Sequence, residues 1–525
     1  MTEILKDRKI EDKNEATDAK GASPRNFSVF GLVLRSCCRN WIFPSGWSVT
    51  LLGLWAALLL FDFAKHGLIL GADPPPPQLD AFEYWRQGGQ LASGDWLLQN
   101  ELGAFRTPGY PAFLAPFHLF GRYGLLMAFG VQHLLVMATS LMTAAVCGRI
   151  TGRSGAAVVA YAISAMCYSR DWHANLILSE NLFTFLLMAI VATTVHYFAR
   201  PSAYGAAAIG FLIGLATLVR PISTYLWVPI GAAMATVLVF GTYAEAGDGR
   251  PRRGMWAVTS HLAMIVLAVY VALTPWLLRN QVLFGSPFMT RFLGRNLWVV
   301  TFEEQSGAGL TLGDGPASSE LKEHLERVDV PVAMDDTWSV SAALTASGLP
   351  DDEIDALMLR VCRELILNSP ETAAYKTIRR TLNFWRCVSN PFPFYEWNPD
   401  QADDRGQYFW RSPSATAAYA RMNRFAASRS LRLNELALVL VIIGSTGLFR
   451  RPETRSLAIA LVLILLYFNV VTAVLEIPSY RYRLILEPIM IACLASGAFA
   501  WFFPARPLLW TGDCPTRTPI ARRNA

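Results

Sequence analysis

The residues best suited to chemistry lie in one polar stretch between two long apolar segments. Asp80 is followed by Glu83 and Tyr84, and Arg106 stands just before a Thr-Pro-Gly-Tyr-Pro turn. A carboxylate can take the proton of an attacking hydroxyl, and an arginine can stabilise developing negative charge through paired hydrogen bonds. The stretch 67–122 is therefore the first candidate for an active-site loop.

Composition indicates that lipid is the main solvent of the chain. Of its 525 residues, 53% are hydrophobic and 16% are charged, whereas a soluble domain carries roughly 25% charged residues. The basic residues behind the net charge of +6 stand mostly at the ends of apolar runs. Because they do not form a continuous basic face with stacking aromatics, nucleic acid is not expected as a partner. We expect an all-α polytopic membrane protein.

Apolar segments that approach the length needed to cross a bilayer, about 20 residues, recur along the chain. Two of them are short, and one pair is separated only by a break at Pro221. We predict ten spans, at 47–65, 123–147, 155–169, 176–198, 204–219, 221–240, 257–278, 433–449, 456–476 and 482–503.

The arginines and lysines of the tails and short turns predict the orientation. With ten spans they fall on one side, which the positive-inside rule assigns to the cytoplasm. Both termini are then cytoplasmic, and two long stretches lie outside. The expected organisation is a cytoplasmic tail over 1–46, seven spans within 47–278 with the external loop 67–122, an external domain over 279–432, three spans within 433–503 and a cytoplasmic tail over 504–525.

The external stretch 279–432 is expected to be mainly helical. Asp351 and Asp352 are suited to cap a helix, and a second helix is expected to end near Trp385. Cys362 and Cys387 could form a disulfide in an oxidising compartment, with two free thiols as the equal alternative. The apolar residues that follow the first cap recur on one helical face, at Ile354, Met358, Val361 and Leu365.

The polar loop as an ordered set resembles the first external loop of a known superfamily. Asp80, Tyr84, Ser-Gly-Asp-Trp at 93–96 and Arg-Thr-Pro at 106–108 match in order and approximate spacing. This set is similar to that of the GT-C glycosyltransferases, in the branch of the protein O-mannosyltransferases and the lipid A aminoarabinose transferase. The resemblance implies a helical bundle with two juxtamembrane helices in the first external loop.

Further matches cover most of the chain outside 300–432. Ser-Glu at 179–180, Leu-Val-Arg-Pro at 218–221, Pro-Trp-Leu-Leu-Arg-Asn at 275–280 and Tyr-Arg-Tyr-Arg at 480–483 resemble segments of the same family. The chain also departs from the family at two positions. Ala81 replaces the second acid of an Asp-Glu pair, and Phe105 replaces an acid before the basic residue, so roles of those acids are not carried over.

The resemblance implies roles for charged residues at the external face. Asp80 is expected to be the general base, and Arg106, Arg279 and Arg483 are expected to bind the phosphate of the donor. The residues expected to orient the sugar, the acceptor or Asp80 itself are Tyr84, Tyr110, Glu180, Arg220 and Arg481.

The implied activity is an inverting sugar transfer from a polyprenyl-phosphate donor to a lipid, glycan or protein acceptor of the cell envelope. The implied place is the external face of a bacterial inner membrane, with membrane lipids around the spans. No cofactor is expected to be required. The seven histidines lack metal-ligand spacing, and a divalent metal between Asp80 and Glu180 stays an open alternative.

Three competing hypotheses accompany this one. A transporter or flippase of lipid-linked sugars would need two matched halves, which the sequence does not show. A catalytically inactive relative that serves in envelope assembly would not need Asp80 and Arg106. A polymerase or ligase of lipid-linked glycans would also have many spans and a large external loop, but not this ordered first loop.

Overall fold

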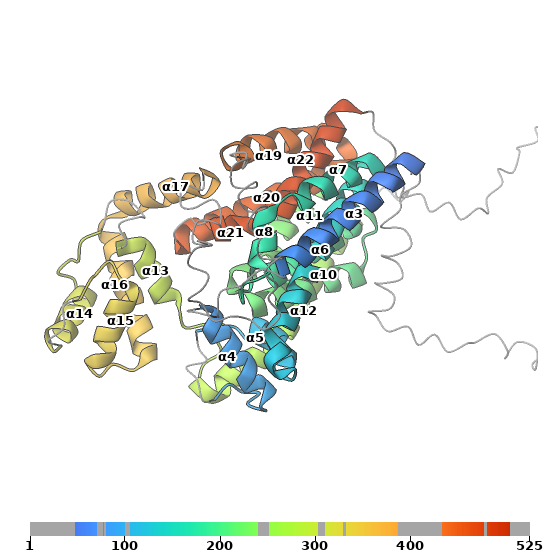
Figure 1. Ribbon diagram of the computed structural model, residues 1–525. Coiled ribbons are helices and arrows are strands. Elements are labelled where there is room, and N and C mark those ends of the chain that lie inside the picture. Colours follow the sequence, from blue (N-terminus) through green and yellow to red (C-terminus); the bar gives the residue numbers. More distant parts are fainter. Residues whose placement is uncertain are drawn as a thin grey trace, which may run out of the picture. The chain divides into compact units, whose positions relative to one another are not determined.

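The computed structural model (Figure 1) describes residues 48–70, 77, 80–99, 105–239, 251–302, 310–328, 332–386, 433–476 and 480–503. Within these ranges the chain forms helices and no strand, so the expected all-α class is confirmed. The predicted tails over 1–46 and 504–525 lie outside the described residues. Cys387 also does, so its pairing with the buried Cys362 stays a prediction.

Each of the ten predicted apolar segments contains a helix. The helices are rich in Ala, Leu, Val and Ile, which are well accommodated when the partner surface is apolar. Their bounds are α3 Val49–Leu70, α6 Gly124–Thr151, α7 Ser154–Ala165, α9 Glu180–Ala199, α10 Ala203–Val219, α11 Trp227–Val239, α12 Pro251–Phe284, α19 Leu433–Phe449, α20 Pro452–Leu475 and α22 Glu487–Phe502.

Five helices of the described residues are long and apolar enough to cross a membrane: α3, α6, α9, α12 and α20. Four further apolar helices, α7, α10, α19 and α22, are shorter than the 18 residues of a full span. Helices of this kind are consistent with a membrane protein. The count of ten spans and the orientation stay predictions.

Small residues let the helices of the bundle approach closely. α10 packs against α12, and a Cβ atom added at Gly210 would lie only 2.2 Å from the carbonyl oxygen of Ile265. A larger residue at Gly210 would therefore push the two helices apart. Close approach through glycine is a common packing mode between helices in membranes, where burial of apolar surface gives little driving force.

The described residues between α3 and α6 include two α-helices. These are α4 Asp80–Ala92 and α5 Gly109–His118, which pack against each other (Figure 1). Asp80 and Glu83 lie in the first turn of α4, where negative charge interacts favourably with the helix dipole. Three short helical turns complete the site region: α8 Tyr168–His173, η3 Pro221–Ser223 and α21 Tyr480–Leu484.

Five helices are described between Leu293 and Arg386, and the first four of them share a core of their own. Most of the buried core residues come from α13, α14, α15 and α16, and Trp298 of α13 is fully buried. The predicted apolar face of α16 is confirmed, because all four of its residues belong to this core. The helices are α13 Leu293–Phe302, α14 Pro316–Glu326, α15 Thr337–Ala346, α16 Asp351–Asn368 and α17 Pro370–Arg386.

The predicted cap of α16 is wrong in detail. Pro350 is the N-cap residue and no side chain makes a capping hydrogen bond. Asp351 instead accepts a hydrogen bond from Arg295 Nη2 at 2.6 Å. A buried arginine needs a carboxylate partner more than a helix end at the surface needs a side-chain cap, because water can satisfy the free N–H groups.

Candidate active site

Asp80 and Arg106 meet at the start of α4. Arg106 Nη2 lies 2.5 Å from Asp80 Oδ1, and Arg106 Nε lies 3.3 Å from Glu83 Oε2. The guanidinium carbon of Arg106 stands 5.2 Å from the centre of the Tyr84 ring. One turn of α4 thus supplies two carboxylates and an aromatic face, so that Arg106 is held on three sides.

A second arginine reaches the same carboxylate from the other end of the chain. Arg481 of α21 places Nη1 and Nη2 each 3.2 Å from Asp80 Oδ2. Its Nε also donates a hydrogen bond to Glu180 Oε1 at the start of α9. Asp80 therefore has one carboxylate oxygen on Arg106 and the other on Arg481. This cluster of Asp80, Arg106, Arg481 and Glu180 is called the outer cluster below.

Glu180 connects the outer cluster to α10. Arg220 Nη1 lies 2.9 Å from Glu180 Oε1, so one oxygen of Glu180 faces two arginines. The other oxygen, Glu180 Oε2, is buried without a hydrogen-bond partner in the described part of the chain. Arg220 also stacks near the Tyr482 ring, with 5.6 Å between the guanidinium carbon and the ring centre. The sequence prediction that Glu180 and Arg220 lie with Asp80 at one face agrees with this geometry.

The backbone around Arg106 and Arg220 explains why the two segments meet. A Cβ atom added at Gly109 would lie 2.6 Å from the backbone carbonyl of Leu218, so only glycine allows α5 to begin against the end of α10. Arg220 ends α10 with extended backbone, φ −144°. The residue before a proline is restricted in this way, and Pro221 follows. The segment that carries Arg106 and the end of α10 that carries Arg220 are therefore adjacent.

The charges of the site set the protonation of its members. Burial alone would raise the pKa of Asp80, but Arg106 and Arg481 outweigh it and hold that pKa below its ordinary value. Burial alone would lower the pKa of Arg481, but Glu180, Tyr482 and Asp80 raise it well above its ordinary value. The pKa of Arg106 is raised in the same way. All three groups are therefore charged at neutral pH.

The outer cluster is accessible to a ligand. The side chain of Asp80 is 34% exposed and that of Arg481 is 30% exposed, whereas Glu180 is fully buried. A bound molecule can thus reach Asp80 and its two arginines while Glu180 holds Arg481 from behind. Within the described ranges, no three His, Cys, Asp or Glu side chains are placed to hold a metal ion.

Tyr84 of α4 and Tyr110 of α5 pack against each other in the interior instead of lining an open surface. Tyr84 and Tyr110 are buried, and their ring centres lie 4.9 Å apart in an edge-to-face contact. Tyr110 Oη donates a hydrogen bond to Gln132 Oε1 at 2.8 Å. Gln132 in turn donates to the carbonyl oxygens of Ala174 and Leu176, which precede Glu180. Gln132 was not among the residues expected at the site, although a polar amide within an apolar helix often has a functional or structural role.

Arg279 binds backbone carbonyl oxygens just after the Ser-Gly-Asp-Trp segment. Its Nε and Nη2 donate to the carbonyl oxygen of Leu97, and Nη2 also reaches that of Leu98. Leu98 has φ +50°, a left-handed conformation that is strained for a leucine and persists only where neighbours impose it. Arg279 therefore holds the end of the Ser-Gly-Asp-Trp loop in its unusual shape.

Arg483 has a comparable anchoring contact. Its side chain is 2% exposed, and Nη1 donates to the carbonyl oxygen of Trp385 at 3.0 Å. Trp385 lies in the last turn of α17, where carbonyl oxygens lack partners within the helix. Neither Arg279 nor Arg483 is among the charged groups that the structure joins to Asp80, whereas Arg481, assigned a lesser role from the sequence, is.

Glu476 is a site residue that the sequence analysis missed. It directly follows α20, and burial raises its pKa above the ordinary value, although a hydrogen bond to Tyr482 and the charges of Arg220 and Arg481 lower it. The signal that could have found it was an acid at the end of an apolar run, just before the Tyr-Arg-Tyr-Arg segment. Acids in such places are costly and often functional.

Comparison with known proteins adds no relative. A scan against protein-family models gave no match, and a search of curated proteins found none that is similar. The class of the protein therefore rests on its fold and its site. Over the described residues, it is an all-helical chain with helices of membrane-spanning length and a partly open cluster of carboxylates and arginines.

Proposed function

We propose that the protein is an integral membrane glycosyltransferase that moves a sugar from a polyprenyl-phosphate donor to an envelope acceptor. The observation that carries the proposal is the outer cluster itself. One partly exposed carboxylate, Asp80, lies between two arginines that come from positions 106 and 481. The cluster borders α9 and follows α20, two helices long and apolar enough to cross a membrane, so a lipid-anchored substrate can present its phosphate there.

The proposed reaction is a single displacement at the anomeric carbon. An acceptor hydroxyl forms the new bond to that carbon, the bond from the carbon to the phosphate oxygen breaks, and the hydroxyl proton passes to Asp80. The electron pair of the broken bond leaves with the polyprenyl phosphate. Attack opposite to the leaving group inverts the configuration of the sugar. No nucleotide is consumed, because the lipid phosphate is the leaving group.

Arg106 and Arg481 are the proposed phosphate binders. Their guanidinium groups now share Asp80, and a phosphate that gains negative charge as it leaves would compete for them through charge-assisted hydrogen bonds. As the arginines turn toward the phosphate, they stabilise the carboxylate of Asp80 less. The pKa of Asp80 then rises from its lowered value, which makes Asp80 a better proton acceptor at the moment when it is needed.

The positions of Arg279 and Arg483 suit a supporting role. Their guanidinium groups bind backbone carbonyl oxygens of the first loop and of α17. Glu180 and Arg220 orient Arg481, and Tyr84 and Tyr110 hold α4 in place. The acceptor is a lipid, a glycan or a protein, and the active site faces the outside of the inner membrane with both termini in the cytoplasm.

The second candidate function is a transporter or flippase of lipid-linked sugars. The observation that favours it is a buried charged group inside a candidate span: Lys65 of α3 lies 2.8 Å from Asp62 and 2.6 Å from Asp171. Ionisable residues within spans often mark a pathway for a substrate or a proton. A third candidate, an inactive relative in envelope assembly, needs neither group.

Release of free polyprenyl phosphate tests the proposal. Purified protein is incubated with a panel of polyprenyl-phosphate sugars and an envelope extract that supplies acceptors. Three proteins are compared: wild type, Asp80→Asn, and Asp314→Asn as the matched control, since the side chain of Asp314 is 98% exposed and far along the chain from the site. Wild type and Asp314→Asn should release lipid phosphate from one donor, and Asp80→Asn should not.

Other outcomes assign the function differently. Equal release by Asp80→Asn would remove Asp80 as the base and leave the transferase without its proposed site. Sugar carried across proteoliposome membranes without release of lipid phosphate would establish the transporter. If neither occurs with a panel that includes the sugars of the source envelope, the assembly role is favoured.

A further inference from the structure

Two cations of α17 are buried, while three of its large apolar side chains, Tyr375, Ile378 and Leu382, are exposed. Lys376 is 1% exposed and Arg380 is 4% exposed, whereas Ile378 and Leu382 are 61% and 56% exposed. Helices of soluble proteins show the opposite pattern. An exposed apolar face on a helix beside a candidate span is expected where lipid, and not water, covers that face.

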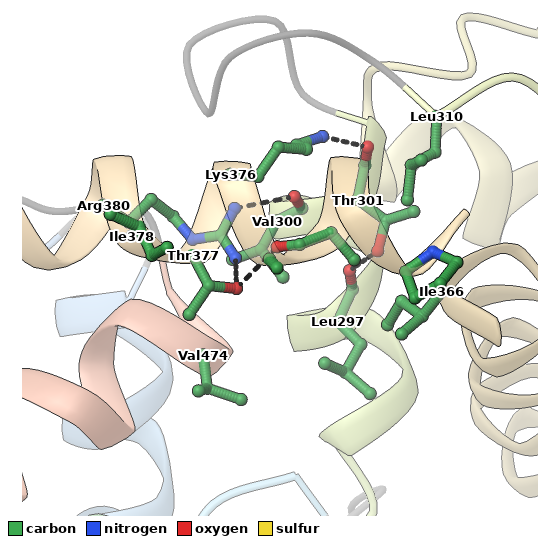
Figure 2. Close-up of a pocket in the computed structure, with 13 residues that line it drawn as sticks. Leu297, Val300, Thr301, Leu310, Ile366, Lys376, Thr377, Ile378, Arg380 and Val474 are labelled. Carbon is green, nitrogen blue, oxygen red and sulfur yellow. Dashed lines mark hydrogen bonds between the residues drawn. The ribbon is translucent and has the colours of Figure 1, made fainter.

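The buried cations contact the ends of two other helices (Figure 2). Lys376 Nζ donates to the carbonyl oxygen of Thr301 at 2.5 Å, and Arg380 Nη1 donates to that of Val300 at 3.2 Å. Arg380 Nε donates to the carbonyl oxygen of Ala473 at 2.6 Å. These oxygens belong to the last turns of α13 and α20, where carbonyl groups have no partner within the helix. Lys376 and Arg380 thus join α13 to the end of α20.

These contacts use only part of what the two cations offer. A lysine has three N–H donors and an arginine has five. Within the described residues, Lys376 makes one hydrogen bond and Arg380 makes three, the third to Thr377 Oγ1. Neither lies within 4.0 Å of a described carboxylate. The C-terminal ends of α13 and α20 carry about half a negative charge each. Together they offset about one of the two positive charges of Lys376 and Arg380, so close to one positive charge is left uncompensated.

A cavity adjoins the two cations. It has a volume of about 440 Å³, and Leu297, Val300, Ile366 and Val474 give it mainly apolar walls (Figure 2). The exposed Ile378 also lines it. This size is within the range of pockets that bind small molecules, roughly 300–1,000 Å³. The combination of apolar walls and two cations matches an amphiphile with a negative head.

The position of the cavity indicates where that amphiphile comes from. Val474 is the second-last residue of α20, a candidate span, and its side chain is 41% exposed. The cavity therefore lies at the level where an apolar span ends, which is the level of lipid headgroups in a bilayer. A lipid phosphate at this level can meet cations, while its chains stay beside the apolar residues of α17 and α20.

We propose that this cavity is a binding site for an anionic membrane lipid. The headgroup phosphate pairs with the remaining donors of Lys376 and Arg380, and the first methylenes of an acyl chain lie along Val474 and Ile378. The site is separate from the outer cluster, and the proposal does not depend on sugar transfer. A bound lipid would strengthen the junction of α13, α17 and α20.

The electrostatics of Lys376 support this geometry. Burial, and then repulsion from Arg380, lower the pKa of Lys376 to about 8. A phosphate beside both cations would remove the repulsion and favour the charged lysine. Burial of such a pair is costly without an anion.

Native mass spectrometry of the delipidated full-length protein tests the proposal. The protein is titrated with phosphatidylglycerol and, separately, with phosphatidylcholine of the same chains. The test variant is Lys376→Gln/Arg380→Gln, in which the amides can still donate to the helix carbonyls. The control is Arg363→Gln/Arg379→Gln, which removes two exposed charges from α16 and α17. Ala374→Trp is a second test variant: Ala374 is exposed and lines the cavity, so a tryptophan there should occupy part of it while both cations are kept.

We expect wild type to bind phosphatidylglycerol at least about tenfold more tightly than phosphatidylcholine, because one charge-assisted hydrogen bond contributes about that factor. The control should keep this preference, and the double Gln variant and Ala374→Trp should both lose it. Equal binding of the two lipids by wild type would overturn the proposal, and so would a preference that survives in Ala374→Trp. Displacement by millimolar glycerol phosphate as effective as that by the lipid would assign the cavity to a soluble anion instead.

Discussion

Two charged clusters of this protein use the same chemistry in opposite settings. In the outer cluster, Asp80 and Arg481 are 34% and 30% exposed. In the second, here called the inner cluster, Lys65 of α3 is paired with Asp62 and Asp171, and the exposed fractions of the three side chains are 5%, 1% and 1%. An open ion pair can exchange a partner for a substrate. A closed one is better suited to hold the elements that contribute to it, because a new partner would first have to displace a buried carboxylate.

The surroundings of the inner cluster agree with a structural role. Lys65 Nζ also donates to the carbonyl oxygen of Ala165 at 2.5 Å, and Tyr161 Oη donates to Asp62 Oδ2 at 2.8 Å. His66 and His133 are joined through their Nδ1 atoms at 2.7 Å. The cluster thus connects α3 with α6, α7 and α8. The comparison teaches that exposure, more than charge, separates a candidate active site from a clamp.

The largest expected effect is on the rate of polyprenyl-phosphate release, and it should distinguish the outer cluster from the inner one. Asp80→Asn should lower the rate of polyprenyl-phosphate release about 10²–10⁴-fold, the usual contribution of a general base. Its melting temperature should stay near that of wild type, because Asp80 is partly solvated. A loss of rate smaller than threefold would contradict the proposed role of the carboxylate.

A substitution in the inner cluster should lower the stability of the fold and leave the rate per folded molecule unchanged. Lys65→Met should lower the free energy of unfolding by about 3–5 kcal/mol, since it leaves two buried carboxylates without their cation. The rate per folded molecule should be retained. Thermal unfolding in detergent, combined with activity normalised to the folded fraction, checks both statements. An intact melting temperature together with lost sugar transport would favour the transporter.

A smaller effect on the rate is expected for Glu476, the carboxyl group beside the outer cluster. Because the pKa of Glu476 is raised, it takes up a proton as pH falls, at a pH above the ordinary range of glutamate. The pKa of Asp80 is lowered, so Asp80 stays ionised there. If sugar transfer requires both carboxyl groups to be ionised, the wild-type rate falls at acidic pH as Glu476 takes up its proton. Glu476→Gln should then shift that fall to lower pH, with about tenfold or less lost at neutral pH. An unchanged pH profile would show that the ionisation of Glu476 plays no part.

The smallest effect is expected at Glu83. Its carboxylate lies 3.3 Å from Arg106 and its side chain is 43% exposed, and an exposed pair of this kind contributes about 0–1 kcal/mol. Glu83→Gln should therefore change the rate by no more than about fivefold. A loss as large as that of Asp80→Asn would transfer the role of the base to Glu83.

Several features of the fold and of the site could be predicted from local sequence patterns. Apolar runs became helices, and the face of α16 with Ile354 and Leu365 became core, because helical spacing and apolar surface dictate both within a few turns. The pairing of Asp80 with Arg106 could also be anticipated, since both belong to one loop in a recognisable order. Glu180 begins α9, Arg220 follows the last residue of the neighbouring α10, and both were expected on the same face.

Other features were decided by the tertiary structure. Arg481 reaches Asp80 across 401 positions, while Arg279 and Arg483, which looked equally suitable in the sequence, bind backbone carbonyls. The inward cations of α17 could not be predicted either, because their partners are the ends of α13 and α20. The sequence by itself determined which segments are helices and which residues carry charge. Only the fold decided which charges meet and which stay open to a ligand, because an arginine makes the same kind of bond to a carboxylate, a helix end or a phosphate.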